Sequence, residues 1–344
     1  MNECSIAVIG ATGAVGQVFL RILEERDFPA SSIRLCASER SIGKRITVGG
    51  RELTVEEATP ELLAEVDFAF ISAGGGVSRE IAPMAVQQGA TVVDKSSAFR
   101  MDADVPLVVP EINGDDLRHH RGIVASPNCT TTPLVMALKP LHDVNPLVRV
   151  IAATYQAVTG SGAAAAQELL DQSRDVLDGA TATPRVYPHQ IAFSVLPRVE
   201  DFGENGYTTE EMKMRNETRK IMHEPNLRVS ATCVRVPVVV SHSIAVNVEF
   251  SKPIGPGEVS EILADMPGVR VLDEPESDVY PTPIQAEGED DVFVGRIRQD
   301  ISLDNGIAMW LSSDNLRKGA ALNAIQIAEE MLARDLLLTP ARRV

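Results

Sequence analysis

A glycine-rich turn close to the N-terminus constrains the fold more than any other feature of the sequence. Residues 5–9 (SIAVI) form a short apolar stretch, residues 10–16 (GATGAVG) follow, and apolar residues then recur at helical spacing from Val18. Strand, glycine turn and helix in this order are the context of a phosphate-binding loop, where glycine permits a tight turn and close approach to pyrophosphate. The spacing is G-x-x-G-x-x-G, not the usual G-x-G-x-x-G, so the match is incomplete. The turn predicts a dinucleotide-binding domain that begins with this strand.

The end of the next apolar stretch bears on which dinucleotide is bound. Residues 33–37 are followed by Ser38, Glu39, Arg40 and Ser41. An acidic residue at this strand end suits the ribose 2′-hydroxyl of NAD, whereas arginine suits the 2′-phosphate of NADP. Arg40 and Ser41 therefore favour NADP, while Glu39 leaves NAD open. A solvated turn with scattered charges is a third interpretation.

The pattern of apolar segments predicts two domains. Short strands expected at 68–72, 91–94 and 105–109, with a helix at 79–88, indicate an α/β domain with a doubly wound, Rossmann-type parallel sheet. Longer apolar stretches at 148–156, 228–240, 243–250, 293–301 and 307–312 indicate an α+β domain with a mixed or antiparallel sheet. A long amphipathic helix at 316–337 is expected to return to the first domain. We therefore expect a dinucleotide-binding domain at 1–126 plus the C-terminal helical segment 316–344, and a second, α+β domain at 127–315.

Composition excludes several classes of function. The 344 residues carry a formal net charge of −16, which argues against nucleic acid and anionic membranes as partners. The sequence leads from Met1 straight into a strand, and we expect neither a signal peptide nor a membrane span. The four cysteines lie far apart without metal-ligand spacing, so no metal is expected and a reducing cytoplasm is the natural location.

Cys129 is the candidate nucleophile. It lies between an apolar strand at 123–125 and a helical stretch that begins at Pro133. A cysteine near a helix N-terminus is stabilised as thiolate by the helix dipole, and the backbone N–H groups there can bind an oxyanion. A free cysteine is more often a small core residue, and this alternative stays open from the residue alone.

Two further residues suit chemistry at a carbonyl carbon. His242 lies at the break between two apolar strands, where it could be the acid and base, or a structural histidine. Arg235, seven residues earlier, could bind a carboxylate through its guanidinium fork or form an internal salt bridge. Glu210 and Lys213 share a helix face at i, i+3 spacing, which by itself indicates an ordinary surface pair.

The sequence resembles the aspartate-β-semialdehyde dehydrogenase family over essentially its full length. The resemblance is carried in order by residues 10–16 (GATGAVG), 94–100 (DKSSAFR), 109–113 (VPEIN), 126–131 (SPNCTT), 154–160 (TYQAVTG), 210–214 (EEMKM), 233–238 (CVRVPV) and 312–316 (SSDNL). Thr159 stands where the family more often has serine, and it keeps the hydroxyl.

The resemblance implies an activity and a role for each motif. The activity is the NADPH-dependent, reversible reductive dephosphorylation of 4-phospho-L-aspartate to L-aspartate 4-semialdehyde through a cysteine thioester, in the biosynthesis of lysine through diaminopimelate, of methionine and of threonine. A homodimer formed across the second domain is implied as well. Catalytic roles are implied for Cys129, His242, Gln156 and Asn128. Substrate binding is implied for Arg235, Glu210 and Gln156, and phosphate binding for Arg100 and Lys213. Cofactor binding is implied for Gly10, Thr12, Gly13, Ala14, Val15, Ser38, Arg40, Ser41, Thr159, Gly160 and Asn315.

Three alternatives stay open at this point. N-acetyl-γ-glutamyl-phosphate reductase shares the fold and the thioester chemistry but has Pro-Gly-Cys around its nucleophile, where this chain has Pro127-Asn128-Cys129. Glyceraldehyde-3-phosphate dehydrogenase shares the mechanism, but it prefers NAD. A catalytically inactive paralogue that serves as a binding module would be expected to lack the cysteine or the histidine, and both are present.

Overall fold

The computed structural model of the chain describes residues 3–338 and divides into two compact units. Unit 1 comprises Met1–Asn128 and Ala320–Val344, and unit 2 comprises Cys129–Gly319. The last six residues of the expected helical segment 316–344 lie outside the described residues, as do residues 1 and 2. The two units are described separately below.

Unit 1 is built on a largely parallel sheet. Within the described residues it has seven strands in the order β3-β4-β2-β1-β5-β6-β7, all parallel except β3, which pairs antiparallel with β4. The strands are β1 (Cys4–Ile9), β2 (Ala30–Cys36), β3 (Arg45–Val48), β4 (Arg51–Glu56), β5 (Phe68–Ile71), β6 (Thr91–Asp94) and β7 (Ile123–Ala125). The predicted Rossmann-type fold is confirmed.

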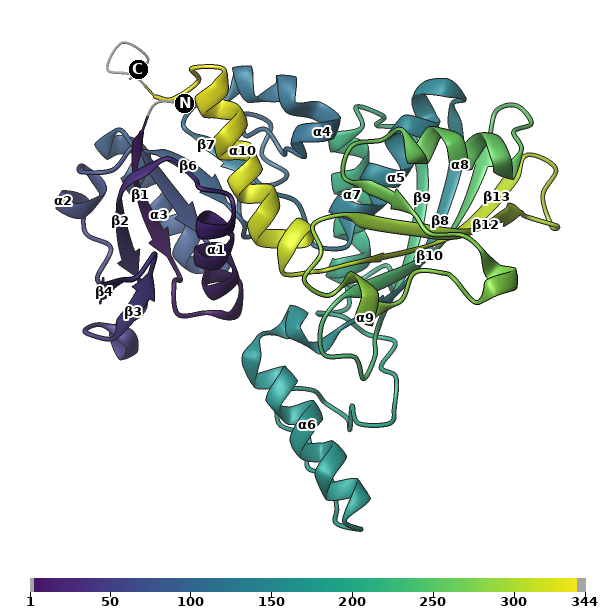
Figure 1. Cartoon of the computed structure of the whole chain (residues 1–344), viewed down its shortest axis with the longest axis horizontal. Helices are drawn as coiled ribbons and strands as arrows, with labels where there is room; N and C mark the ends of the chain where they lie inside the picture. Colours follow the sequence, from purple (N-terminus) through teal and green to yellow (C-terminus); the bar gives the residue numbers. More distant parts are fainter. Residues whose placement is uncertain (1–2, 339–344) are drawn as a thin grey trace. The chain divides into compact units, whose positions relative to one another are not determined.

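Helices cover both faces of this sheet (Figure 1). The helices are α1 (Ala14–Glu25), α2 (Pro60–Leu63), α3 (Gly75–Gln88), α4 (Pro110–Asn113) and α10 (Leu322–Ala333), with short 3₁₀ turns at Glu39–Ser41 and Gly114–His119. Ile6 and Val8 of β1 pack with α1 and α10, whereas the intervening Ala7 and Ile9 pack with α2 and α3. Because side chains alternate along a strand, β1 is apolar on both sides, as a central parallel strand must be.

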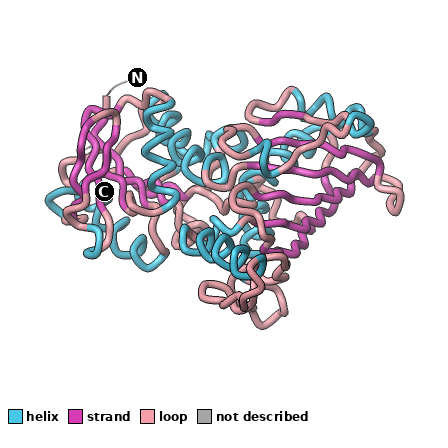
Figure 2. The backbone as a smooth tube through the Cα atoms, turned by 60° about the horizontal axis from the view of Figure 1, so that its bottom comes forward, coloured by secondary structure: helices cyan, strands magenta, loops and turns pink. Residues whose placement is uncertain are grey.

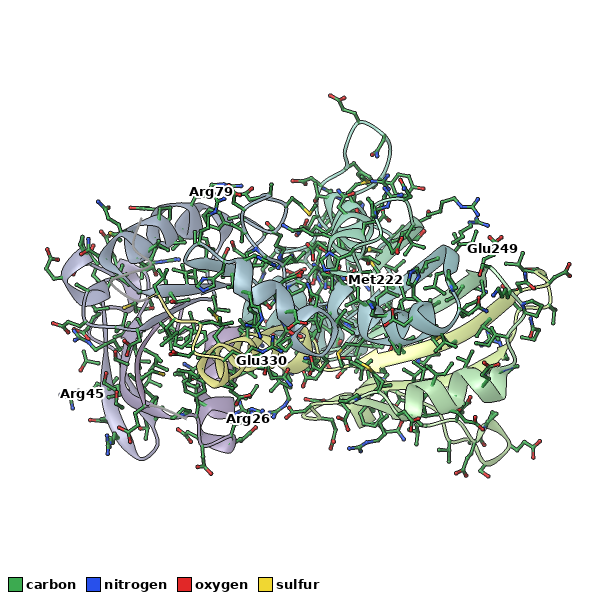
Figure 3. All side chains as sticks on the ribbon, turned by 90° about the horizontal axis from the view of Figure 1, so that it is seen from above. Arg26, Arg45, Arg79, Met222, Glu249 and Glu330 are labelled. Atoms are coloured by element: carbon green, nitrogen blue, oxygen red, sulfur yellow. The ribbon has the colours of Figure 1, made fainter. Side chains whose placement is uncertain are left out.

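The C-terminal helix belongs to unit 1. Arg26, at the end of α1, forms a two-point ion pair with Glu329 of α10, with N–O distances of 2.8 and 2.7 Å (Figure 3, where Arg26 and Glu330 are labelled). The regular helix is shorter than the predicted 316–337, because a π-helical turn at Arg317–Ala321 precedes α10 and the chain turns after Ala333.

One predicted strand of unit 1 is wrong. Residues 105–109 run beside β7 but make a single bridge, between Leu107 and Ala125. Pro106 has no N–H to donate, and Pro110 begins α4 directly afterwards, so a strand cannot be extended here.

Unit 2 contains a mixed sheet, one of the two arrangements that the sequence predicted. Figure 2 shows its strands side by side. Their order in the described residues is β11-β12-β13-β10-β8-β9, with β8 parallel to β9, β11 parallel to β12, and the other neighbours antiparallel. The strands are β8 (Leu147–Gln156), β9 (Arg228–Arg235), β10 (His242–Phe250), β11 (Val269–Val271), β12 (Val292–Gln299) and β13 (Gly306–Ser313). The helices are α5 (Thr131–Val144), α6 (Ala163–Leu177), α7 (Thr209–Ile221), α8 (Pro256–Ala264) and α9 (Pro283–Ala286), with 3₁₀ turns at Val158–Ser161 and Pro275–Ser277.

The two faces of this sheet differ. Val150, Ala152 and Thr154 of β8 are fully buried, whereas Ile151 and Tyr155, which point to the opposite face, are partly exposed or exposed. The buried face lies against helices, since α5, α7 and α8 contact the sheet strands. The opposite face is a more accessible surface, on which the rings of Tyr155 and Trp310 lie 5.1 Å apart. Helix α6 projects from the rest of unit 2 (Figure 1).

The strand predicted at 228–240 ends early. β9 stops at Arg235, and residues after it leave the sheet so that the carbonyls of Val238 and Val239 accept hydrogen bonds from the N–H groups of Val158 and Thr159. Pro237 lacks the N–H that a continuing strand would need. This early exit brings the end of β9 next to the turn that follows β8.

Candidate active site

Cys129 lies two residues before the first residue of α5 and is half-buried. Thr130, the N-cap residue, makes no capping hydrogen bond with its side chain. Gly319 lies close by, because a methyl group there would come within 3.1 Å of the Cys129 Cβ. The position beside a helix N-terminus is the one that the sequence predicted, and it favours the thiolate.

The other cysteines do not share this environment. All four cysteines of the chain are free, and Cys4, Cys36 and Cys233 are buried. Burial raises the pKa of Cys36 to about 11 and that of Cys4 to about 12, and it raises the pKa of Cys233 further still. Their thiols therefore stay protonated near neutral pH, which leaves Cys129 as the accessible nucleophilic sulfur.

His242 contacts the Cys129 sulfur. The distance from Cys129 Sγ to His242 Nε2 is 3.3 Å, and the imidazole is 1% exposed. On its other side, Nδ1 accepts a hydrogen bond from the Ala157 N–H at 2.9 Å. A neutral imidazole has one donor and one acceptor nitrogen, so this bond places the hydrogen on Nε2, directed at the sulfur.

The backbone turns sharply to bring His242 into place. Ser241 has a φ of 73°, which costs energy for a residue with a side chain, and its N–H donates to Asn315 Oδ1 at 2.8 Å. Asn315 in turn donates to Thr159 Oγ1 at 3.1 Å. Two residues predicted to bind the cofactor are therefore hydrogen-bonded to each other and support the turn before His242.

Arg235 ends β9 and is 5% exposed. Its Nη1 donates to the Ala157 carbonyl at 2.7 Å, while its Nε is buried without a hydrogen-bond partner. Among residues 3–338 no ion pair forms with its guanidinium, so the internal salt bridge considered from sequence is absent from the described structure. A buried cation without an anion is costly, which makes this guanidinium a candidate to bind a carboxylate.

Gly160 lies where Arg235 and His242 come together. A methyl group at Gly160 would lie 2.8 Å from Arg235 Nη1 and 3.3 Å from His242 Cε1. A side chain would therefore push both groups away from this point. The Ala157 backbone, which binds His242 through N–H and Arg235 through C=O, was not predicted from sequence, because backbone groups leave no signal in residue type.

A second cluster is formed by Gln156, Glu210 and Lys213. The Gln156 amide donates to Glu210 Oε1 at 3.0 Å and accepts from the Thr154 hydroxyl at 3.0 Å. The other Glu210 oxygen lies 3.4 Å from Lys213 Nζ. Glu210 is 3% exposed, so the pair is not the ordinary surface pair that helical spacing suggests. Lys213 also forms an ion pair with Glu200, which was not predicted.

The glycine turn of unit 1 has the features of a phosphate-binding loop. Gly10 has a φ of 89°, and a methyl group on it would lie 2.4 Å from the Ser72 carbonyl oxygen, so a side chain cannot be accommodated. Helix α1 starts directly after Gly13 without a side-chain cap and without an acidic residue in its first turn. The N–H groups of Gly10, Ala11 and Gly13 donate to backbone carbonyls, whereas those of the first helical residues, Ala14–Gly16, are available to an anion such as pyrophosphate.

The end of β2 supplies polar and basic groups to the same loop. Thr12 Oγ1 lies 3.4 Å from Ser41 Oγ, which in turn lies 3.3 Å from Lys44 Nζ. Arg40 is exposed and makes no ion pair or hydrogen bond with any residue that the structure describes. Lys44 was not predicted as a cofactor residue, although its basic side chain three residues after Ser41 was a signal.

Arg100 is buried within unit 1. It is 4% exposed, and its guanidinium donates to the carbonyls of Ser126 and Lys95 at 2.9 and 2.7 Å. Asn128 is also buried, at 6% exposed. The predicted residues thus fall in two sets. Unit 2 holds Cys129, Gln156, Thr159, Gly160, Glu210, Lys213, Arg235, His242 and Asn315, and unit 1 holds Gly10, Thr12, Gly13, Ala14, Val15, Ser38, Arg40, Ser41, Arg100 and Asn128.

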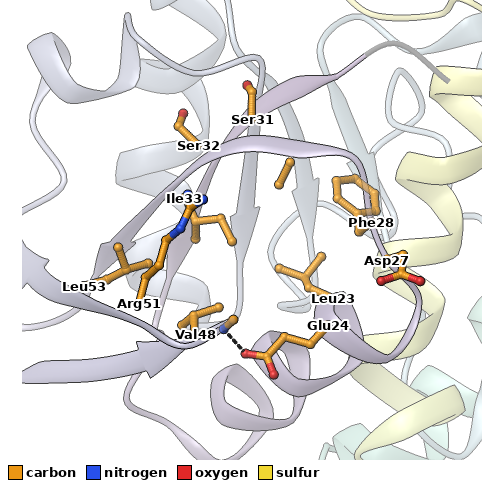
Figure 4. A pocket seen from close by; sticks show the side chains of 12 residues that line it. Leu23, Glu24, Asp27, Phe28, Ser31, Ser32, Ile33, Val48, Arg51 and Leu53 are labelled. Carbon is orange, nitrogen blue, oxygen red and sulfur yellow. Dashed lines mark hydrogen bonds between the residues drawn. The ribbon is translucent and has the colours of Figure 1, made fainter.

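A pocket of about 300 Å³ in unit 1 is unrelated to these residues (Figure 4). It lies between the end of α1, the start of β2 and the β3–β4 hairpin, where the Gly49 N–H donates to Glu24. The glycine turn is at the opposite end of both α1 and β2. Over the described residues there is also no cluster of three metal-ligating side chains and no helix long and apolar enough to cross a membrane.

Comparison with known proteins identifies the family. Residues 5–120 match the family described as semialdehyde dehydrogenase, NAD binding domain, and residues 138–318 match semialdehyde dehydrogenase, dimerisation domain. Aspartate-semialdehyde dehydrogenase of Aquifex aeolicus is 50% identical over 336 residues, which cover 96% of this chain and 99% of that protein. The chain belongs to the aspartate-semialdehyde dehydrogenase family. It is an oxidoreductase, as the sequence resemblance implied.

Solved structures agree with this membership. The crystal structure of aspartate semialdehyde dehydrogenase II from Vibrio cholerae, complexed with ASA, has a TM-score of 0.94 and 42% identity, and the match covers 97% of this chain and 99% of that one. The family member from Candida albicans, solved with NADP, has a TM-score of 0.77 and 26% identity over 97% of this chain and 100% of that one. These matches do not favour the two alternatives considered from sequence, N-acetyl-γ-glutamyl-phosphate reductase and glyceraldehyde-3-phosphate dehydrogenase.

Proposed function

We propose that this protein catalyses the NADPH-dependent, reversible reductive dephosphorylation of 4-phospho-L-aspartate to L-aspartate 4-semialdehyde, in the biosynthesis of lysine, methionine and threonine. The observation that carries the proposal is the arrangement around Ala157, whose backbone binds both the His242 imidazole and the buried Arg235 guanidinium, while His242 contacts the Cys129 sulfur. Membership of the family supports the assignment. A binding module without catalysis would have no need for this arrangement.

Cys129 carries out the first step. Its thiolate attacks the acyl carbon of the acyl phosphate, the C–S bond forms, and the bond from carbon to the phosphate oxygen breaks. His242 assists by donating a hydrogen bond from Nε2–H to the thiolate, which stabilises it before the attack. We assign the departing phosphate to Lys213 and Arg100, since both are cationic and Arg100 is fixed by two carbonyl acceptors. The product of the step is a thioester on Cys129.

The second step releases the aldehyde. Bound NADPH supplies the hydride that reduces the thioester carbonyl. Backbone N–H groups beside Cys129 and the Nε2–H of His242 then stabilise the oxygen, which carries negative charge until the C–S bond breaks and the thiolate leaves. His242 thus donates a hydrogen bond to this oxygen in both directions of the reaction, and the Ala157 N–H holds the imidazole in place through Nδ1.

Other side chains of unit 2 orient the substrate. We assign the α-carboxylate to Arg235, whose fork is buried and free of ion pairs in the described structure, and the amino group to Glu210. Gln156, fixed between Thr154 and Glu210, positions the reacting carbonyl. Asn128 precedes the nucleophile and is assigned to the catalytic set with it.

The residues of the glycine turn and the β2 end fit NADP. The uncapped start of α1 suits the pyrophosphate, and Arg40, Ser41 and Lys44 suit the 2′-phosphate. The full set assigned to the cofactor is Gly10, Thr12, Gly13, Ala14, Val15, Ser38, Arg40, Ser41, Thr159, Gly160 and Asn315. We accordingly assign cofactor binding to residues 1–126 with 316–344, and catalysis and dimerisation to 127–315.

We further propose that the protein is a homodimer in the cytoplasm. The match to a dimerisation domain covers the unit 2 sheet, whose accessible face carries Ile151, Tyr155 and Trp310. An apolar sheet face of this kind is typically covered by a partner. The reactive thiol of Cys129 requires a reducing compartment. A monomeric mass in sedimentation equilibrium would contradict the dimer.

The direct test is an assay of the purified protein in the phosphorylating direction. We expect turnover with L-aspartate 4-semialdehyde, inorganic phosphate and NADP, and a marked preference for NADP over NAD. The control replaces the aldehyde with N-acetyl-L-glutamate 5-semialdehyde, which should be a poor substrate because its acylated nitrogen cannot pair with Glu210. Equal or better turnover with the acetylated aldehyde would overturn the substrate assignment.

A further inference from the structure

Lys213, the lysine assigned to phosphate, is already paired with two carboxylates. Its Nζ lies 3.4 Å from Glu210 Oε2 and forms a second, shorter ion pair with Glu200. Glu210 and Lys213 are on α7, whereas Glu200 belongs to the loop that precedes this helix. Two carboxylates on one ammonium group weaken the attraction of that group for an incoming phosphate.

The two carboxylates are held in different ways. The Glu210 side chain is 4% exposed and is fixed by the Gln156 amide at 3.0 Å, so it is part of the buried cluster. The Glu200 side chain is 43% exposed. An exposed carboxylate can be displaced into solvent, whereas a buried one with a fixed hydrogen bond cannot move without breaking the cluster.

The loop nevertheless presents Glu200 to Lys213 in a defined geometry. Glu200 has a φ of 64°, a left-handed conformation that is uncommon for a residue with a side chain. The Thr209 hydroxyl donates to Glu200 Oε2 at 2.7 Å, and the Arg198 Nε donates to the Glu200 carbonyl at 2.9 Å. Strained backbone that is fixed by neighbours often marks a functional position.

We propose that Glu200 is a displaceable counter-ion of Lys213, which occupies the phosphate position in the absence of phosphate and competes with it. Phosphate binding requires the Glu200 carboxylate to move away, and return of Glu200 to Lys213 after thioester formation favours release of phosphate. Glu200 is thus a positioning residue that sets phosphate affinity through Lys213. The inference rests on the proposed function, because it takes Lys213 as a phosphate ligand.

The test measures steady-state kinetics in the phosphorylating direction, with inorganic phosphate as the varied substrate. Glu200→Gln keeps the size of the side chain and removes its charge, so the KM for phosphate should fall by roughly 2- to 5-fold. The KM for the aldehyde should stay unchanged, because Arg235 and Glu210 hold that end. Thr209→Val, which removes the hydroxyl that holds Glu200, should lower the phosphate KM by a smaller factor.

The controls separate a local effect from a general change in charge. Glu204→Gln removes the same charge from the same loop, at an exposed position without a partner among the described residues, and should leave the phosphate KM unchanged. In Lys213→Met the phosphate KM should rise, and adding Glu200→Gln to it should have no further effect, because Glu200 acts through Lys213.

The outcomes distinguish the role of Glu200 from the assignment of Lys213 as a phosphate ligand. A raised phosphate KM in Lys213→Met together with an unchanged or raised phosphate KM in Glu200→Gln overturns the role of Glu200 and leaves the phosphate site in place. An unchanged phosphate KM in Lys213→Met overturns both the phosphate site and the inference built on it.

Discussion

Arg235 is the residue whose surroundings point most directly to a ligand. Its guanidinium is buried, bound by one carbonyl at 2.7 Å, and forms no ion pair within residues 3–338. Folding a chain with an uncompensated buried charge is unfavourable, so the bound state that supplies an anion is the state for which the site is built. The α-carboxylate of the proposed substrate is such an anion.

Arg235→Lys should therefore lower kcat/KM for the aldehyde by on the order of 10-fold or more, which corresponds to a loss of roughly 1.4 kcal/mol. Lysine keeps the charge but cannot form two parallel hydrogen bonds with a carboxylate. Misplacing that end also moves the carbonyl away from Cys129, so kcat should fall as well. Steady-state kinetics with varied aldehyde at saturating phosphate measure both constants.

The matched control is Arg228→Lys on the same strand, where the side chain is 62% exposed and lies 3.8 Å from Glu249. It should leave both constants unchanged. If Arg235→Lys instead raised the KM for phosphate and left the aldehyde kinetics normal, Arg235 would belong to the phosphate site and the carboxylate would need another partner.

At the residue scale the sequence offered candidate side chains but not what holds them. Cys129 and His242 were candidates from their positions next to apolar strands, the family resemblance favoured a catalytic role for both, and the structure places Cys129 Sγ and His242 Nε2 3.3 Å apart. The Ala157 backbone groups that fix His242 and Arg235 could not be predicted, because every residue has the same N–H and C=O. Glu200 was missed because it lies in a loop, and no regular spacing in the sequence links a loop residue to Lys213 on the helix.

At the scale of elements, local patterns were reliable where one segment determines its own structure. The strand, glycine turn and helix at β1 and α1 agree with prediction because the turn needs glycine and the flanking residues alternate or recur as each element requires. The strands predicted at 105–109 and 228–240 are too long. An apolar pattern indicates that residues are buried, but not that they pair in a sheet, and Pro106 and Pro237 lack the N–H that pairing needs. The hairpin β3–β4 was not predicted, since its exposed residues give little apolar signal.

The end of β2 carries a prediction at this scale. Arg40→Ala should raise the KM for NADP by roughly 10-fold while changing that for NAD by less than about 2-fold, because only NADP has the 2′-phosphate that a guanidinium can bind. Initial rates with each cofactor at saturating aldehyde and phosphate give the comparison.

Arg45→Ala is the matched control, since Arg45 is exposed on β3, the next strand along the chain, and pairs with Glu52 at 2.9 Å (Arg45 is labelled in Figure 3). It should affect neither cofactor. Equal losses for NADP and NAD in Arg40→Ala would show that Arg40 supports the loop and does not discriminate between the cofactors.

At the scale of the whole molecule, the proposed chemistry depends on one sulfur among four. Cys4, Cys36 and Cys233 are buried, and burial keeps their pKa values far above neutral pH. Cys129 alone combines partial exposure, a helix N-terminus and contact with a histidine among the described cysteines. The net charge of −16 lies on a chain that is proposed to bind anions, so the cations at Arg100, Lys213, Arg235 and Arg40 must act locally.

Intact-protein and peptide mass spectrometry of the enzyme after mixing with L-aspartate 4-semialdehyde and NADP, in the absence of phosphate, tests whether Cys129 forms the thioester. Without phosphate the thioester cannot be resolved by its second substrate, so we predict the added mass of one aspartyl group per chain, located on the peptide that contains Cys129. NADPH should form in a burst that does not exceed about one equivalent per chain. Cys129→Ser, which binds NADP normally because the cofactor residues are intact, should show neither adduct nor burst. An adduct on another cysteine, or a burst that persists in Cys129→Ser, would contradict the account.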